Sequence, residues 1–124
     1  MLPTKAYAAL NETSPLAPYE FNRRSVGDCD VLIQIQYCGV CHSDLHQARG
    51  EWGNSVFPMV PGHEIVGTVT HVGSKVSKAK VGDFVGVGCF VDSCRTCASC
   101  KEGLEQYCEG HLSLTYNGTE QDQV

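Results

Sequence analysis

Residues 62–76 read GHEIVGTVTHVGSKV, and the middle of this stretch combines β-branched residues with glycines. The segment IVGTVTHVG (65–73) therefore predicts a β-strand. A second segment of the same character, FVGVGCFV (84–91), predicts another strand. Glycines inside strands are typical of tight curvature or close backbone approach, so the two segments together favour a small barrel.

Three other segments complete a mainly β organisation. VLIQIQY (31–37) alternates apolar side chains with glutamines and predicts a half-buried strand, with these residues on the apolar face: Val31, Ile33, Ile35 and Tyr37. SDLHQARG (43–50) predicts a short helix with Ser43 as its N-cap and Gly50 after its end. The polar stretch 73–83 is expected to connect two strands, and the polar tail 115–124 is expected to be mobile.

Composition limits the kinds of function. The chain has 124 residues, of which 42% are hydrophobic and 19% charged, and its formal net charge is −5. These values indicate one globular domain, and the absence of any Lys/Arg run argues against a nucleic-acid partner. No apolar stretch is long enough to span a bilayer, so we expect no membrane partner and a cytoplasmic location. Thiols stay reduced in that compartment, and clustered cysteines there indicate metal before disulfides.

Four cysteines follow the spacing C-x2-C-x2-C-x7-C, within a lobe that spans residues 92–110. Thiolates this close in sequence can meet at one tetrahedral zinc ion, and four of them leave no open coordination position. The pattern thus predicts a structural zinc site at Cys94, Cys97, Cys100 and Cys108. An iron–sulfur cluster is one alternative, although the fourth cysteine lies farther away than in bacterial ferredoxins and precedes Glu109 rather than proline. Four unliganded thiols are the other.

A second group of residues that can bind metal or transfer protons lies in CGVCHSDLH (38–46) and PGHE (61–64). Cys41 and His63 can bind a second metal, with Asp44 accepting the spare N–H of the His63 ring. Ser43 and His46 are three residues apart, on one face of a helix, where a hydroxyl and an imidazole can pass a proton outward. The alternatives are that Cys41 is a small buried hydrophobe and Ser43 only a helix cap. Cys38 and Cys41 also form a C-x-x-C pair, for which redox or zinc chemistry is a further interpretation. We favour packing for Cys38, because the strand pattern runs directly into it.

These motifs resemble the zinc-dependent medium-chain alcohol dehydrogenases. GHEIVGTVTHVGSKV, the following VGD (81–83) and the four-cysteine lobe occur in the order of that family. YCGVCHSDLH, EWG and GVGCFVDSC are most similar to its cinnamyl-alcohol-dehydrogenase-type branch. The resemblance extends through about Tyr116 and implies a GroES-like catalytic domain, a distorted β-barrel, of which residues 1–124 would form the N-terminal part.

The resemblance also implies a role for each candidate site residue. Cys41 and His63 match two ligands of a catalytic zinc, and Glu64 matches an acidic neighbour that can approach or replace a ligand. Ser43 matches the hydroxyl that hydrogen-bonds the substrate oxygen, and His46 the outer end of a proton relay. Asp44 remains the residue that orients His63. Trp52 matches an aromatic position in the substrate pocket. The implied activity interconverts primary alcohols and aldehydes with NAD(P)(H), and the branch suggests NADP.

The sequence departs from the family in two ways. It contains no G-x-G-x-x-G turn, so we expect the cofactor-binding Rossmann domain to be absent. The family's third zinc ligand, a cysteine, would lie beyond Val124, and the positions of the other cysteines do not match it: Cys29, Cys38 and Cys89. We therefore expect a truncated catalytic domain that is inactive alone and keeps its catalytic zinc only if the incomplete site can hold it.

The expected truncation also leaves a barrel edge open. An unpaired edge favours self-association, which makes a second copy of the chain a possible partner beside the small alcohol or aldehyde. The alternative function is a stand-alone zinc-binding structural or interaction module without catalysis.

Overall fold

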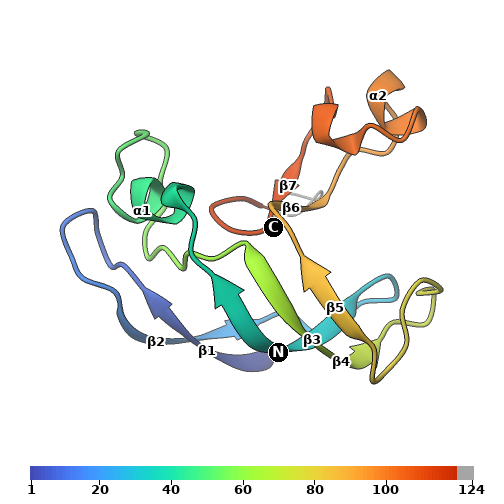
Figure 1. Ribbon diagram of the computed structural model, residues 1–124, viewed down its shortest axis with the longest axis horizontal. Coiled ribbons are helices and arrows are strands. Elements are labelled where there is room, and N and C mark those ends of the chain that lie inside the picture. Colours follow the sequence, from blue (N-terminus) through green and yellow to red (C-terminus); the bar gives the residue numbers. More distant parts are fainter. Residues whose placement is uncertain (120–124) are drawn as a thin grey trace.

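The computed structural model describes residues 1–119, in which every strand takes part in an antiparallel pairing (Figure 1). The elements in chain order are β1 Leu2–Ala8, β2 Ala17–Arg23, β3 Val31–Gly39, α1 His42–Ala48, β4 Glu64–Val72, β5 Phe84–Val87, β6 Phe90–Asp92, α2 Ala98–Lys101, the 3-10 helix η1 Glu105–Tyr107, and β7 Ser113–Leu114. The prediction of a mainly β fold is confirmed. None of the helices in this described part is long and apolar enough to cross a membrane.

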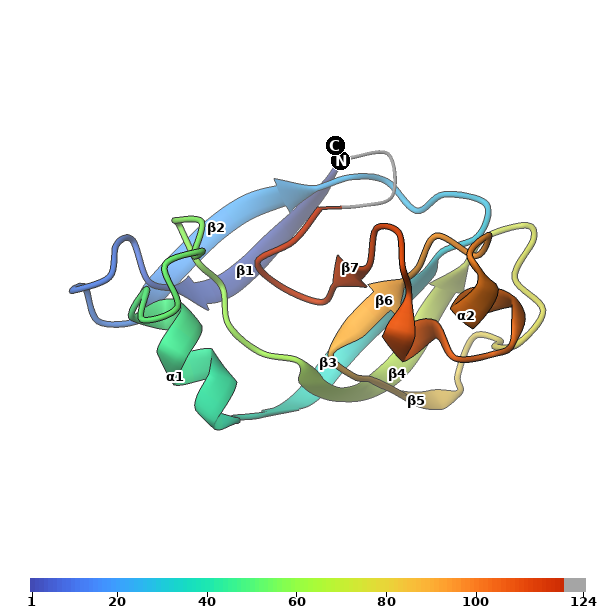
Figure 2. The same ribbon diagram turned by 90° about the horizontal axis from the view of Figure 1, so that it is seen from above.

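The strands form three small sheets: β1-β2, β3-β4-β5 and β6-β7. Figure 2, a view from above, shows the β1-β2 hairpin lying alongside the central sheet rather than within it. This hairpin was not predicted from the sequence. Its connection is stabilised by Ser14, whose Oγ accepts hydrogen bonds from the backbone N–H groups of Leu10 and Asn11.

Strand β3 is where it was predicted, but its side chains do not alternate as predicted. Ile35 is 52% exposed and Tyr37 is 73% exposed, so neither lies on a buried face. The register with β4 shifts between Leu32 and Ile33 and again between Ile35 and Tyr37. The extra residue is Thr70 of β4 at the first irregularity and Gln36 of β3 at the second, so only the second changes which face the following β3 side chains occupy. The period-two pattern of the sequence therefore does not describe a single face of this strand.

The segment 84–91, predicted as one strand, is two. β5 pairs with β4, whereas β6 pairs with β7, and the chain changes sheets at Gly88 and Cys89. The prediction was wrong because β-branched composition does not mark where a strand leaves its sheet. After the break, β6 leads into the cysteine-rich lobe. The polar stretch 73–83 connects β4 and β5, as expected.

The N-cap of helix α1 lies two residues earlier than predicted. It is Cys41, so Ser43 lies inside the first turn and is not the cap. The Asp44 carboxylate accepts the backbone N–H of Cys41, which satisfies a donor that the helix itself leaves open. Gly50 follows the helix with φ of 66°, as expected for the residue after a helix end.

The hydrophobic core of the described residues is small. The buried apolar residues are Ala8, Ala9, Met59 and Val69. Ala9 and Met59 also exchange two backbone hydrogen bonds of 2.8 Å, which attach the end of β1 to the segment before β4. The accessible surface is 8504 Å², whereas a compact monomer of this mass exposes about 6,500 Å². Several large apolar side chains are consequently open to solvent, among them Tyr37, Val40 and Phe84.

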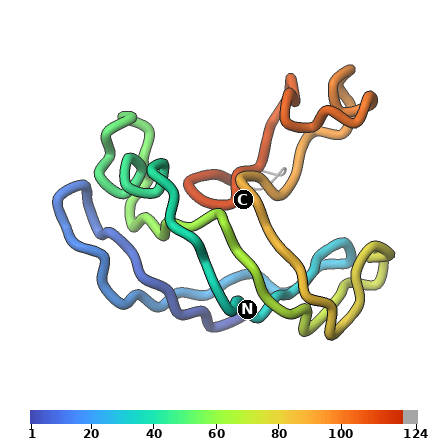
Figure 3. Tube along the Cα trace, in the orientation of Figure 1, coloured from blue at the N-terminus to red at the C-terminus, as the bar shows by residue number. Residues whose placement is uncertain are grey.

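The C-terminal segment was expected to be mobile from residue 115, and this was wrong for its first residues. The backbone N–H of Thr115 donates to the carbonyl of Cys89. The Asn117 side chain accepts from the N–H of Val56 and donates to the carbonyl of Asn54. Figure 3 shows this end of the trace folding back toward the segment before β4. Residues 120–124, the rest of the predicted tail, lie outside the described residues.

Candidate metal centres

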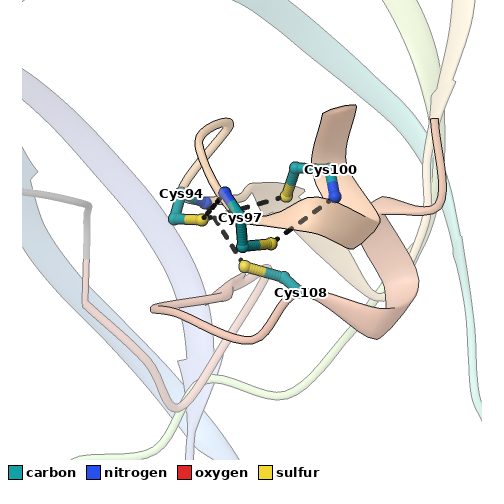
Figure 4. Close-up of side chains that lie close together, drawn as sticks. All are labelled: Cys94, Cys97, Cys100 and Cys108. Carbon is teal, nitrogen blue, oxygen red and sulfur yellow. Dashed lines mark hydrogen bonds between the residues drawn. The ribbon is translucent and has the colours of Figure 1, made fainter. Parts of the chain in front are cut away.

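The four cysteines of the 92–110 lobe converge between β6 and β7, with α2 and η1 around them (Figure 4). Their four sulfurs all lie within 4.8 Å of one another, and the Sγ atoms of Cys94 and Cys100 are 4.0 Å apart. A tetrahedral zinc with Zn–S bonds of about 2.3 Å needs sulfurs about 3.8 Å apart. In a four-iron cluster each thiolate binds a separate iron, and in a two-iron cluster two thiolates bind each iron, so in both cases the four sulfurs would spread farther. The arrangement thus fits one tetrahedral ion.

Backbone N–H groups point at these sulfurs. The N–H of Cys97 donates to Cys94 Sγ at 3.4 Å, and the N–H groups of Cys100 and Glu109 donate to Cys97 Sγ at 3.5 and 3.4 Å. Hydrogen bonds from backbone donors favour the thiolate. The N–H of Thr96, followed by that of Cys97, lowers the pKa of the Cys94 thiol to about 5. The N–H of Glu109, followed by that of Cys100, lowers the pKa of Cys97.

Cys100 differs from these two thiols. A contact with the Ser93 hydroxyl lowers its pKa, but partial desolvation and the neighbouring Cys97 and Cys108 sulfurs outweigh that contact and raise the pKa to about 11. Four thiolates repel one another in the absence of a cation, so the last proton is held tightly. A divalent metal would replace that proton, and the donor set therefore suits a metal better than four free thiols.

A second cluster forms where β3 ends and β4 begins. Gly39 pairs with Glu64 across the two strands, which places Cys41, two residues past the end of β3, next to His63 and Glu64. Ligand atoms of these three side chains lie within 4.8 Å of one another. His63 is buried, Cys41 is half-buried and Glu64 is exposed. A thiolate, an imidazole and a carboxylate are all ligands that zinc accepts.

Asp44 lies beneath this cluster and is only 5% exposed. One carboxylate oxygen accepts the N–H of Cys41 and the other accepts the N–H of Gly62, both at 2.8 Å. Asp44 Oδ1 also lies 3.4 Å from His63 Nδ1, yet that buried nitrogen makes no hydrogen bond within the described residues. Asp44 therefore fixes the backbone on both sides of the cluster. Its carboxylate lies within reach of the His63 ring, as predicted, although the two groups do not form a hydrogen bond in this structure.

The two candidates for a proton relay, Ser43 and His46, both lie on α1. Within residues 1–119 no hydrogen bond joins Ser43 to His46. The His46 ring stacks between His42 and Trp52, with centroid distances of 5.1 Å to each. His46 Nδ1 pairs with the carboxylate of Glu51, and this contact lowers the pKa of Glu51. A proton path from Ser43 to His46 thus needs a bridging group, such as a substrate or cofactor hydroxyl or a water.

Tyr116 is the site residue that sequence reasoning missed. Its ring stacks on the ring of His63, with centroids 5.2 Å apart and planes 18° from parallel. Burial, followed by the negative groups Asp44, Cys41 and Cys89, raises the pKa of the Tyr116 hydroxyl to about 12. The only signal in the sequence was an aromatic residue within an otherwise polar tail.

The remaining candidate residues, Trp52 and three further cysteines, lie outside the two clusters. Trp52 is 53% exposed and contacts the site through His46. Three other cysteines are exposed and belong to neither cluster in the described residues: Cys29, Cys38 and Cys89. Cys38 Sγ lies close to Gly62, but the residue is exposed, so its packing role stays a prediction.

The fold and the two clusters together define a class of protein: a mainly β domain with one all-cysteine cluster and one mixed Cys/His/Glu cluster, each able to hold a metal ion. The chain belongs to the alcohol dehydrogenase GroES-like domain family, whose family model matches residues 27–124. The chain is 55% identical over 123 residues to NADP-dependent alcohol dehydrogenase C 1 of Mycolicibacterium smegmatis, covering 98% of this chain and 35% of that protein.

Solved structures agree with the family. A cinnamyl alcohol dehydrogenase of Sorghum bicolor superposes with a TM-score of 0.93 at 52% identity, covering 97% of this chain and 34% of that one. The cinnamyl alcohol dehydrogenase of Helicobacter pylori, solved with NADP(H), also gives 0.93 at 45% identity, covering 99% and 36%. The GroES-like fold predicted from the sequence is confirmed. The chain spans about a third of the length of the relatives it matches.

Proposed function

We propose that this chain forms part of the catalytic domain of a zinc-dependent alcohol dehydrogenase that interconverts primary alcohols and aldehydes with NADP(H). The observation that carries the proposal is the separation of two donor sets. One has four sulfur donors, which would fill the coordination sphere of a tetrahedral ion, and the other combines Cys41, His63 and Glu64 at a partly open surface. Structural and catalytic zinc sites differ in this respect.

The all-cysteine set would hold a structural zinc and stabilise the 92–110 lobe. The mixed set would hold a second zinc through Cys41 and His63, with Glu64 as a carboxylate able to approach it. Zinc bound there supplies Lewis-acid stabilisation of an alkoxide near neutral pH. Asp44 keeps the two ligands in place through its bonds to the N–H groups of Cys41 and Gly62.

The chain's own residues would handle the proton. The Ser43 hydroxyl lies in the first turn of α1, two residues from Cys41, where it can accept the proton of a bound alcohol. His46 lies one turn later with its Nδ1 against Glu51, so the imidazole can take up the proton when a bridging hydroxyl or water connects it to Ser43. The exposed Glu51 carboxylate stabilises the resulting imidazolium.

The hydride acceptor is assigned by similarity. The Mycolicibacterium relative is named for its NADP dependence, and the Helicobacter structure contains NADP(H). A nicotinamide carries the redox step in such enzymes, and the protein holds it against the substrate carbon. We therefore assign NADP(H) as the cofactor and a small alcohol or aldehyde as the substrate.

The test uses the full gene product that carries these residues. Purified protein is analysed for zinc and assayed with primary alcohols and aldehydes, with NADP(H) and NAD(H) in parallel. We expect two zinc ions per chain and NADP-linked turnover that a chelator abolishes. Cys41→Ala should lose one zinc and the activity, whereas Cys29→Ala is the matched control and should lose neither.

The alternative is a zinc-binding structural or interaction module without catalysis, favoured by the large exposed apolar surface. Bound zinc together with no turnover on any alcohol or aldehyde would support the module. Self-association through an open sheet edge stays a prediction, and sedimentation of the purified protein at several concentrations tests it.

A further inference from the structure

The ring of His63 is enclosed but not fixed by hydrogen bonding. The residue is 7% exposed, and its Nδ1 has no hydrogen-bond partner among the described residues. Asp44 faces that nitrogen from 3.4 Å without forming the bond. A metal-binding histidine usually has its ring orientation set by a hydrogen bond from the nitrogen that does not bind metal. Another contact must therefore hold this ring.

Tyr116 provides that contact. Its ring lies nearly parallel to the His63 ring, 18° from coplanar, at a centroid distance of 5.2 Å. Stacked rings at this separation attract each other and restrict rotation of the smaller ring about its χ2 angle. The stack sets the plane of the imidazole, and the Asp44 carboxylate lies at its edge.

Tyr116 is itself held between two anchors. On one side, Thr115 donates its N–H to the carbonyl of Cys89 and its hydroxyl to the carbonyl of Gly88, at the break between β5 and β6. On the other side, the Asn117 side chain bonds to Val56 N–H at 2.8 Å and to the Asn54 carbonyl at 3.1 Å. Residues on both sides of the tyrosine are thus tied to different segments, which leaves its ring little freedom to move off His63.

We propose that Tyr116 is a positioning residue that orients the His63 ring for metal binding by stacking on it, beside the Asp44 carboxylate at the edge of the ring. The inference rests on the proposed function in one respect only, because it assigns His63 as a metal ligand. The inference has two parts: Tyr116 sets the plane of the His63 ring in the metal-free chain, and this orientation strengthens metal binding. The two halves can therefore be tested separately.

The metal half is tested with cobalt in place of zinc in the full gene product. Competition with a chromophoric chelator measures the affinity of each site, and Cys41→Ala identifies the signal of the mixed site. Tyr116→Ala should weaken cobalt binding at that site by about 10-fold or more, as loss of a ligand's orienting partner does. Tyr116→Phe keeps the ring and should retain both the affinity and the visible spectrum of bound cobalt.

The four-cysteine site is the internal control, since a merely unfolded variant would lose both sites. If Tyr116→Ala does not fold, the same measurement is made on Tyr116→Leu, which keeps an apolar side chain at this position but removes the flat ring. Equal cobalt affinity and an unchanged cobalt spectrum in Tyr116→Leu and the parent protein would overturn this half of the proposal.

The metal-free half is tested by NMR with ring-labelled histidine. The ring protons of His63 should lie upfield because the ring stacks on that of Tyr116, and this shift should persist in Tyr116→Phe and vanish in Tyr116→Leu. Identical His63 resonances in all three proteins would contradict the stack. A parent protein that binds cobalt only at the four cysteines would instead refute the proposed function, and the resonances would then decide the role of Tyr116 alone.

Discussion

Asp44, on helix α1, accepts a 2.8 Å hydrogen bond from the backbone N–H of Gly62, a residue 18 positions later in the chain. The other oxygen of the same buried carboxylate accepts from Cys41. One side chain thereby joins the start of the helix to the segment that carries His63. This junction, rather than any direct bond between the ligands, brings the mixed metal centre together.

Asp44→Asn should therefore destabilise the domain. The amide replaces one accepting oxygen with a donor that faces a backbone N–H, and a buried hydrogen bond to a charged group contributes about 1.5–3 kcal/mol. We expect a loss of this size in urea unfolding, together with weaker metal binding at Cys41 and His63. Asp28→Asn, which alters an exposed carboxylate, is the control and should change stability little. Equal stability of the parent and Asp44→Asn would show that the junction is dispensable.

Gly62→Ala should also be costly, for two separable reasons. Gly62 has φ of 118°, a conformation that costs a side chain about 1–3 kcal/mol. An added Cβ would moreover lie 2.6 Å from Cys38 Sγ. Thermal unfolding should show a large loss for Gly62→Ala that Cys38→Ala only partly restores. Gly88→Ala, with no atom near the added methyl group, is the matched control. Full restoration by Cys38→Ala would mean that backbone strain contributes nothing.

Cys97→Ser should remove one metal ion and loosen the 92–110 lobe while leaving the sheets intact. Cys97 Sγ accepts two backbone N–H groups, so it is a ligand candidate and also an organiser of the loop. Hydrogen exchange measured by mass spectrometry should speed up in the lobe and remain unchanged in β3 and β4. Cys89→Ser provides the control outside the cluster. Protection lost equally across the whole domain would argue against a locally acting structural site.

Ser43→Ala should impair turnover of the full gene product more than His46→Ala. Ser43 is the first acceptor of the substrate proton, and proton transfer of this kind contributes roughly 10²- to 10⁴-fold to rate. His46 lies at the outer end, where water can replace it, so its loss should be milder and mainly visible at low pH. Steady-state kinetics over a pH series measures both. Ser74→Ala, remote from the site, should match the parent enzyme, and a larger effect of His46→Ala than of Ser43→Ala would reverse the proposed order.

Asp30→Asn should lower stability in a pH-dependent manner. A hydrogen bond from Arg24 holds the pKa of Asp30 below its usual 3.8, and the N–H of Gly27 adds to this. A lowered folded-state pKa contributes stability that is present above about pH 3.8 and is lost as the pH falls through the folded value. The difference between parent and variant should be at most about 1 kcal/mol near neutral pH and should disappear in acid. Glu20→Gln, in a fully exposed pair with Lys5, should show no such difference.

Local sequence determined the parts of this protein that depend on neighbours in the chain. The spacing of Cys94, Cys97, Cys100 and Cys108 confines four thiols to a short loop, so their convergence follows from chain length alone. The helix predicted over 43–50, the strand predicted over 65–73 and the glycine after the helix at position 50 likewise follow from local preferences, although the helix and strand bounds differ by one or two residues from those observed. The Gly-His-Glu segment and its flanking motifs also identified the family, because such motifs preserve a backbone arrangement along with the residues.

Tertiary structure decided everything that depends on register and on distant contacts. Gln36 is an extra residue in β3 that breaks the alternation between Ile35 and Tyr37, and no alternation pattern records where a bulge will form. The change of sheet at Gly88 divided one apparent strand into two. The stack of Tyr116 on His63 joins residues that neither composition nor spacing connects, because it depends on Asn117 reaching back to the segment before β4. Sequence thus supplied the ligand types, whereas the pairing of β3 with β4 and the returning C-terminal segment set their positions.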